Sequence, residues 1–226
     1  LPATPPSIPG YDIACRGVPA LGVGGDYYDF IPIDDGRMAL CVADVSGKGF
    51  SAAMLMANLQ ATIRSQTLAG VSPADCARRS NRLLHRSMDI GRFATCFYGV
   101  LDLQSGRLAY SNAGHDHPLV SRPGGEEVAL IAGGPVLGAF DDQAYEEAAI
   151  TLEPGEVLVA YSDGITESFD SQGRPFGISG LRAALARARD GCALEILEAI
   201  LTAAVAHAKG HPQSDDMTLV VFRVLT

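Results

Sequence analysis

The sequence predicts an α+β fold: two mainly antiparallel sheets packed face to face, with a pair of helices outside each, a four-layer α-β-β-α sandwich. One observation is that short apolar segments are joined by tight turns at residues 34–36, 104–106 and 153–156, as antiparallel neighbours are. The other is that helical periodicity is confined to two regions, each long enough for two helices. A chain of 226 residues can bury this core in one domain.

Strands are expected where apolar or alternating residues are bounded by turn-forming residues. These segments are residues 11–17, 26–33, 37–45, 94–103, 107–113, 118–121, 127–132, 144–152, 157–161 and 217–225. Residues 133–135, Gly-Gly-Pro, are expected to form a loop. The short hairpins argue against a parallel doubly wound sheet.

The first helix pair is expected over residues 50–69 and 72–89. In the first helix, apolar residues recur at four-, three- and four-residue steps and share one face: Ala52, Met56, Leu59 and Ile63. Ser72 and Pro73 suit the N-cap and the first turn of the second helix. The other pair is expected over residues 180–189 and 194–208.

Composition narrows the function classes. The apolar fraction of 47% and charged fraction of 19% are those of an ordinary globular protein. No segment has the roughly 18 consecutive apolar residues of a membrane span, and no signal peptide is recognisable. The net charge of −9 argues against binding to a nucleic-acid backbone.

Cysteine usage and the start of the chain suggest the cellular context. The five cysteines are odd in number and form no C-x-x-C pair, which predicts buried free thiols in a reducing cytoplasm rather than a disulfide framework or a zinc site. Residues 1–9 are proline-rich and begin with Leu1, so we interpret them as a linker from a longer protein. Residues 10–226 are then the domain.

Acidic residues beside turns are the main functional signal. Asp44 and Asp163 each end an apolar run directly before a turn, Asp215 lies just before the last expected strand, and Asp26 follows two glycines. A single such aspartate is more often a turn residue or a helix cap. Four in the same context, with few histidines, predict a site for Mg²⁺ or Mn²⁺. Such a site can activate water to hydrolyse a phosphate ester.

Competing motifs are incomplete. Gly47-Lys48 is followed by Gly49 where a P-loop requires Ser or Thr, and no G-x-G-x-x-G, H-E-x-x-H or G-x-S-x-G occurs. Residues 115–117, His-Asp-His, are interpreted as structural or supporting rather than as an imidazole ligand pair. A metal-dependent phosphodiesterase or nuclease would use similar carboxylates, but it does not suit the acidic charge balance.

Six ordered motifs resemble one family. They are residues 24–30 (GGDYYDF), 43–49 (ADVSGKG), 111–115 (SNAGH), 134–138 (GPVLG), 161–167 (YSDGITE) and 213–221 (QSDDMTLVV). Together they are similar to the SpoIIE/RsbU branch of the metal-dependent (type 2C, PPM) serine/threonine protein phosphatases. The resemblance covers residues 10–225 and implies the sandwich described above, with two Mn²⁺ or Mg²⁺ ions at one end. A third, weaker ion stays open.

The resemblance also implies residue roles. Asp44 is expected to bridge the ions, with the Val45 carbonyl as a further ligand. Asp163 and Asp215 are expected to bind one ion, and Asp26 the other, directly or through water. Supporting positions are expected at Asp29, Asp216 and Gly164. The family's eukaryotic members place a histidine after the bridging aspartate and hold phosphate with an arginine. Neither has a clear counterpart here, so no general acid is assigned, and Lys48 is the candidate for holding phosphate.

The resemblance finally implies partners. The substrate would be a phosphorylated STAS-domain anti-anti-sigma protein in a sigma-factor partner-switching pathway, and an upstream sensor or receiver domain would lie in the same polypeptide. A cytoplasmic location, no nucleic acid and no membrane contact are expected, and a homodimer is left open. The alternative function is a weakly catalytic pseudophosphatase that binds a phosphoprotein or an anti-sigma partner.

Overall fold

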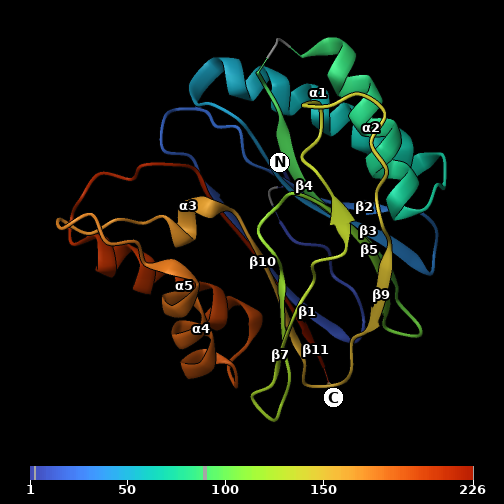
Figure 1. Cartoon of the computed structure of the whole chain (residues 1–226). Helices are drawn as coiled ribbons and strands as arrows, with labels where there is room; N and C mark the ends of the chain where they lie inside the picture. Colours follow the sequence, from blue (N-terminus) through green and yellow to red (C-terminus); the bar gives the residue numbers. More distant parts are fainter. Residues whose placement is uncertain (3, 89–90, 226) are drawn as a thin grey trace.

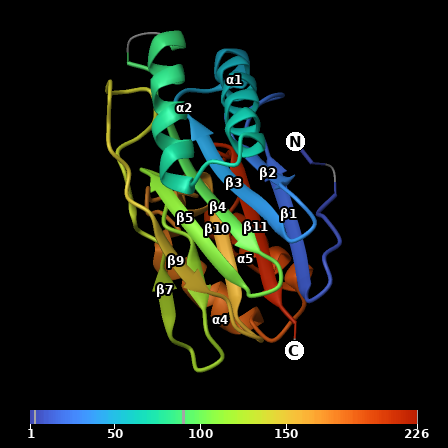
Figure 2. The ribbon, with the colours of Figure 1, turned by 90° about the vertical axis from the view of Figure 1, so that its right-hand side faces the viewer.

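The structure is a computed structural model that describes residues 1–2, 4–88 and 91–225. Two sheets lie face to face and helices cover both outer surfaces (Figures 1 and 2), which confirms the predicted four-layer sandwich. Within the described ranges, no helix has both the length and the apolar character needed to cross a membrane.

Sheet 1 has the strand order β1-β11-β10-β6-β7, and all these neighbours are antiparallel. Its strands are β1 (Tyr11–Val18), β11 (Met217–Val224), β10 (Val157–Tyr161), β6 (Leu119–Ser121) and β7 (Glu127–Ala129). The pairing of β10 with β11 sets Tyr161 opposite Leu219, so the end of β10 meets the start of β11.

Sheet 2 has the order β2-β3-β4-β5-β8, and β9 also pairs with β5. Its strands are β2 (Tyr27–Pro32), β3 (Arg37–Val45), β4 (Ala94–Asp102), β5 (Arg107–Ala113), β8 (Gly133–Gly134) and β9 (Ala148–Thr151). The pairing of Tyr27 with Ala43 places the start of β2 beside the end of β3.

The helices form two pairs on opposite sides of the sheets (Figure 1). Against sheet 2 lie α1 (Gly49–Leu68) and α2 (Pro73–Ser87), and against sheet 1 lie α4 (Gly177–Ala188) and α5 (Ala193–Ala208). The predicted cap of α2 is confirmed, because the Ser72 side chain accepts a hydrogen bond from the backbone nitrogen of Asp75. Asp89, the expected end of this helix, lies outside the described residues.

Apolar side chains fill three layers. Phe30, Phe97 and Phe222 are among those between the two sheets. Leu59, Ile63 and Leu84 fill the layer between sheet 2 and its helices, and Leu185, Ile196 and Leu197 fill the layer between sheet 1 and its helices. Burying such side chains contributes roughly 1.5–3 kcal/mol each, so these layers fix the positions of the strand ends that carry the aspartates.

Several elements differ from expectation. A single-turn helix, α3 (Asp163–Thr166), follows β10, and α4 begins earlier than residue 180. Residues 133–134 form the short parallel strand β8 instead of a loop. Glycine permits this pairing, since a Cβ at Gly133 would lie 1.8 Å from the carbonyl oxygen of Asn112. Only residues 148–151 of the expected strand 144–152 pair, as β9.

Two residues of the expected linker, 1–9, contact the domain. The Tyr28 hydroxyl donates a hydrogen bond of 3.0 Å to the Pro2 carbonyl, and Ile8 pairs with Tyr11. The five cysteines are free, as predicted. The prediction that they are buried holds for Cys41, Cys76 and Cys96. It is wrong for Cys15, which is half-buried, and for Cys192, which is exposed at the start of α5.

Candidate metal centre

Strand ends bring four predicted aspartates to one end of the sandwich. Asp44 lies near the end of β3, and Asp26 directly precedes β2, which pairs with β3. Asp163 begins the turn after β10, and Asp215 lies just before β11, which pairs with β10. Each sheet therefore contributes one pair of acidic segments.

These carboxylates change one another's ionisation. Burial, followed by the negative charges of Asp215 and Asp216, raises the pKa of Asp44 to about 6. Burial, followed by the charge of Asp44, raises the pKa of Asp163 to about 7 and also raises the pKa of Asp26 well above its usual value. A cation that neutralises this repulsion would bind favourably.

Hydrogen bonds hold two of the acidic side chains. Ser162 Oγ donates to Asp26 Oδ2 at 2.7 Å. Asp216 Oδ1 and Oδ2 accept from the backbone nitrogens of Ala20 and Gly25, both at 2.7 Å. Asp216 therefore holds the loop that leads to Asp26.

Glycines allow the backbone to come close to this site. A Cβ at Gly25 would lie 2.7 Å from the Val45 carbonyl oxygen and 3.4 Å from Asp44 Oδ1. A Cβ at Gly164 would lie 2.0 Å from the carbonyl oxygen of Asp216. The space beside these oxygens is thus available only while both positions are glycine.

Lys48, at the start of α1, reaches the same end of the molecule. Its Nζ lies 2.8 Å from Asp215 Oδ2 and also donates to the Ser214 carbonyl. The hydrogen bond to Asp215 raises the pKa of Lys48, which therefore stays positively charged beside the carboxylates.

A small polar cavity adjoins Asp44 and Asp163, and the sequence interpretation gave its other residues too little weight. The cavity has a volume of about 70 Å³, and its wall includes Thr95, His115 and Asp116. His115 Nδ1 lies 2.8 Å from Thr95 Oγ1, while His115 Nε2 and Asp116 Oδ2 are buried without a hydrogen-bond partner in the described part of the chain. Burial lowers the pKa of His115 to about 4, so the ring is neutral. The SNAGH motif was the available signal.

Asp29 does not belong to this group, contrary to expectation. It is buried on the side of β2 that faces α1, where it accepts hydrogen bonds from Arg64 Nε at 2.6 Å and from the Tyr27 hydroxyl at 2.7 Å. Successive side chains of a strand point to opposite faces, so a residue of β2 near Asp26 need not share its surroundings. Asp29 joins a helix to a sheet.

The donor atoms suit a hard divalent cation, although they are not yet arranged around one point. Within the described ranges, no three or more His, Cys, Asp or Glu side chains are placed so that they could hold a metal ion as they stand. The donors at hand are carboxylate and carbonyl oxygens, which Mg²⁺ and Mn²⁺ prefer, and the unpartnered Asp116 Oδ2 adds another.

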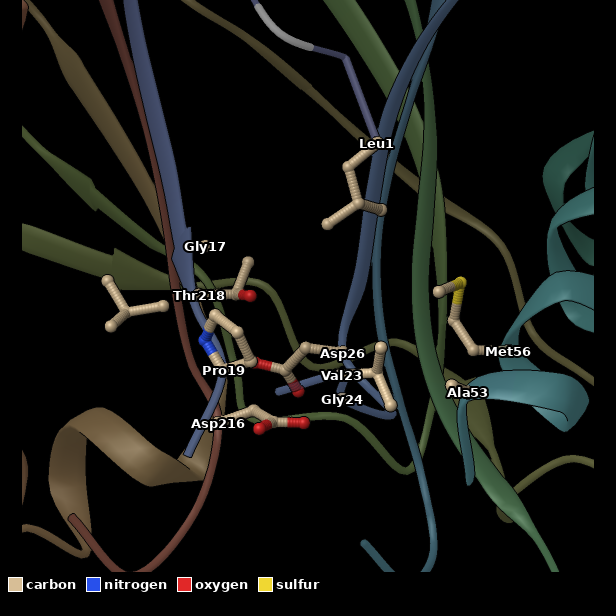
Figure 3. Close-up of a pocket in the computed structure, with 11 residues that line it drawn as sticks. Leu1, Gly17, Pro19, Val23, Gly24, Asp26, Ala53, Met56, Asp216 and Thr218 are labelled. Atoms are coloured by element: carbon tan, nitrogen blue, oxygen red, sulfur yellow. The ribbon is translucent and has the colours of Figure 1, made fainter. Parts of the chain in front are cut away.

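An apolar cavity of about 250 Å³ lies beside the Asp26 loop (Figure 3). Asp26 and Asp216 lie along one side of it, and Leu1 and Met56 are among its apolar lining. The loop that carries Asp26, helix α1 and Leu1 therefore line one cavity together.

Comparison with known proteins identifies the family. The family model described as Stage II sporulation protein E (SpoIIE) matches residues 34–225, so the chain belongs to the SpoIIE family. Protein IcfG of Synechocystis sp. is 28% identical over 97% of this chain and 39% of that protein. Phosphoserine phosphatase RsbU of Bacillus subtilis is 33% identical over 69% of this chain and 47% of that protein. The chain therefore spans about half or less of these curated relatives.

Solved structures agree on the fold. The RsbU and RsbW domains of Rv1364c from Mycobacterium tuberculosis match with a TM-score of 0.82 and 28% identity, over 98% of this chain and 62% of that one. Two more distant structures are described with metals. RsbX in complex with magnesium has a TM-score of 0.72 and 18% identity, over 97% and 98% of the two chains. The PstP catalytic domain with two manganese ions has a TM-score of 0.69 and 15% identity, over 96% of this chain and 99% of that one. At these identities they show the fold alone.

Proposed function

We propose that this chain is a divalent-cation-dependent phosphatase that hydrolyses phosphoserine or phosphothreonine in a protein. The observation that carries the proposal is the gathering of Asp26, Asp44, Asp163 and Asp215 from four chain segments at one end of the sheets, with raised pKa values for the first three. Similarity to the phosphoserine phosphatase RsbU supports the same chemistry.

The cation would be Mn²⁺ or Mg²⁺, held by the four aspartates and the Val45 carbonyl. Two ions are proposed, in keeping with the two manganese ions described for PstP and the magnesium described for RsbX. When bound, such cations activate water and neutralise charge on the phosphoryl group, so that no protein nucleophile is required.

The remaining polar residues position these parts. Ser162 orients the Asp26 carboxylate, and Asp216 holds the preceding loop in place. Lys48 supplies a positive charge that can move from Asp215 to the substrate phosphate. Asp116 Oδ2 and His115 Nε2 offer two polar atoms that can bind a water in the adjoining cavity.

The proposed substrate is a phosphorylated STAS-domain anti-anti-sigma protein in a partner-switching pathway of the cytoplasm. The similarity to RsbU, and to a protein that combines RsbU and RsbW domains, supports this choice. An upstream sensor or receiver domain would control the activity, since the chain spans only part of its relatives.

The test is phosphate release from a serine-phosphorylated STAS-domain protein during a titration with Mn²⁺. We expect release to require the metal, and Asp44→Asn and Asp163→Asn to reduce it at least about 100-fold while circular dichroism shows an intact fold. Stable binding without release would support the pseudophosphatase instead. Cleavage of a phosphodiester in place of the phosphoprotein would support a phosphodiesterase.

A further inference from the structure

Two adjoining hollows lie beside α5. The larger, of about 420 Å³, lies between α5 and the end of β1, and the smaller, of about 170 Å³, lies between residues 168–169 and 210–214. They share Val205, Gln213 and Met217, and we call them together the α5 groove. In Figure 1 the loop after α5 lies beside the loop between α3 and α4, where the smaller hollow is found.

The α5 groove is mainly apolar and open to solvent. Val205 is 59% exposed and Phe169 is 38% exposed, above the buried Leu201 and Met217. The charged residues in its wall, Arg16 and Glu198, pair with each other at 2.6 Å. The groove therefore suits an uncharged, partly apolar stretch of polypeptide better than a charged small molecule.

The groove is joined to the candidate metal centre through the backbone. Gln213 Nε2 donates one hydrogen bond to the Val18 carbonyl and another to the Asp215 carbonyl, both at 2.7 Å. The smaller hollow also includes Ser214, whose carbonyl accepts from Lys48. One wall of the groove is thus the segment that carries a proposed metal ligand.

We propose that the α5 groove binds the polypeptide that flanks the phosphoserine of the protein substrate, with an apolar side chain packed on Val205 and Met217. This inference rests on the proposed function. The argument is that the groove and the candidate metal centre share one loop. A phosphoserine bound near Asp215 is part of a polypeptide, and the groove begins at residues 210–214, directly before Asp215. A ligand without that chain would leave the exposed apolar surface uncovered.

The experiment measures binding of a fluorescein-labelled, serine-phosphorylated STAS-domain protein by fluorescence anisotropy. Val205→Gln should raise Kd about five- to tenfold, the loss expected for one apolar contact. KM for this protein should rise equally with kcat unchanged, while turnover of p-nitrophenyl phosphate should be unaffected because this compound does not reach the groove. Leu194→Gln is the matched control. It is 54% exposed, lies about three turns away on the same face of α5, and is not part of the groove.

Each outcome decides the inference. Equal Kd values for Val205→Gln and the unaltered chain, equal losses in both variants, or no binding to the unaltered chain would overturn it. Self-association that Val205→Gln abolishes would assign the groove to a second copy instead. Release of phosphate with no effect of Val205→Gln removes the groove and keeps the proposed function. Val205-dependent binding with no release of phosphate from either substrate would support binding in the α5 groove and contradict the proposed phosphatase function.

Discussion

At Gly25 the backbone passes so close to the Val45 carbonyl that an added methyl group would lie 2.7 Å from the oxygen and 3.2 Å from Ala52 Cβ. Gly22, in the same loop, has no atom within 4 Å of the position of its Cβ. Substitutions at these two glycines therefore distinguish an effect of close packing, at Gly25, from an effect of reduced backbone flexibility, at Gly22.

We expect Gly25→Ala to lower the free energy of unfolding by about 1–3 kcal/mol, as overpacking does, and to weaken Mn²⁺ binding by displacing Asp26. Gly22→Ala should stay within about 0.5 kcal/mol of the unaltered chain. Urea unfolding and calorimetric titration measure both effects. Equal behaviour of the two variants would show that the Gly25–Val45 approach does not shape the site.

The candidate site was predictable from sequence where a motif stood at either end of a strand. Asp44 and Asp163 come at or after the end of a strand and Asp215 comes before the start of one, and the structure gathers them. Asp29 was misplaced because its motif position does not reveal which face of β2 it occupies. The place of Asp116 in the cavity was not predictable, because the cavity is formed with Thr95 of β4, which lies far from Asp116 in the sequence.

At the scale of elements, strands and helices with strong periodicity were predicted with ends that differ by a few residues. The elements that the sequence did not predict are short. β8 and α3 have too few residues to show a hydrophobic periodicity, and each forms where a neighbouring backbone or strand end supports it. The order of strands in each sheet depends on long-range pairing, such as β1 with β11, which spacing along the chain cannot reveal.

One ion pair joins α1 to sheet 2. Arg64 binds Asp29, whose side chain is fully buried, so Arg64→Ala would leave a buried charge without its partner. We expect a loss of roughly 2–4 kcal/mol in the free energy of unfolding. In the exposed pair of Arg37 with Asp34, Arg37→Ala should lower the free energy of unfolding far less, because water screens an exposed ion pair. Chemical denaturation compares them, and similar costs would mean that water replaces Arg64 at Asp29.

For the whole molecule, the burial of these carboxylates, together with their mutual repulsion, predicts how stability depends on pH. The folded-state pKa values of Asp44 and Asp163, about 6 and about 7, exceed the ordinary value of 3.8. Between pH 4 and 7 the folded chain therefore binds more protons than the unfolded chain, and stability falls as pH rises. Without divalent cations, Tm should be lower at pH 8 than at pH 5, and Mn²⁺ should raise Tm more at pH 8. A metal-free Tm that rises over this range would contradict the raised pKa values of these buried carboxylates.

The central claim is that these carboxylates form one cation site, and calorimetric titration with Mn²⁺ tests it most directly. Asp44→Asn removes the negative charge that acts on both Asp26 and Asp163. Asp35→Asn alters an exposed turn outside the site and serves as the control. We predict that Asp44→Asn weakens Mn²⁺ binding at least about 100-fold, equivalent to about 2.7 kcal/mol, and that Asp35→Asn binds like the unaltered chain. Equally tight binding by Asp44→Asn would contradict the account.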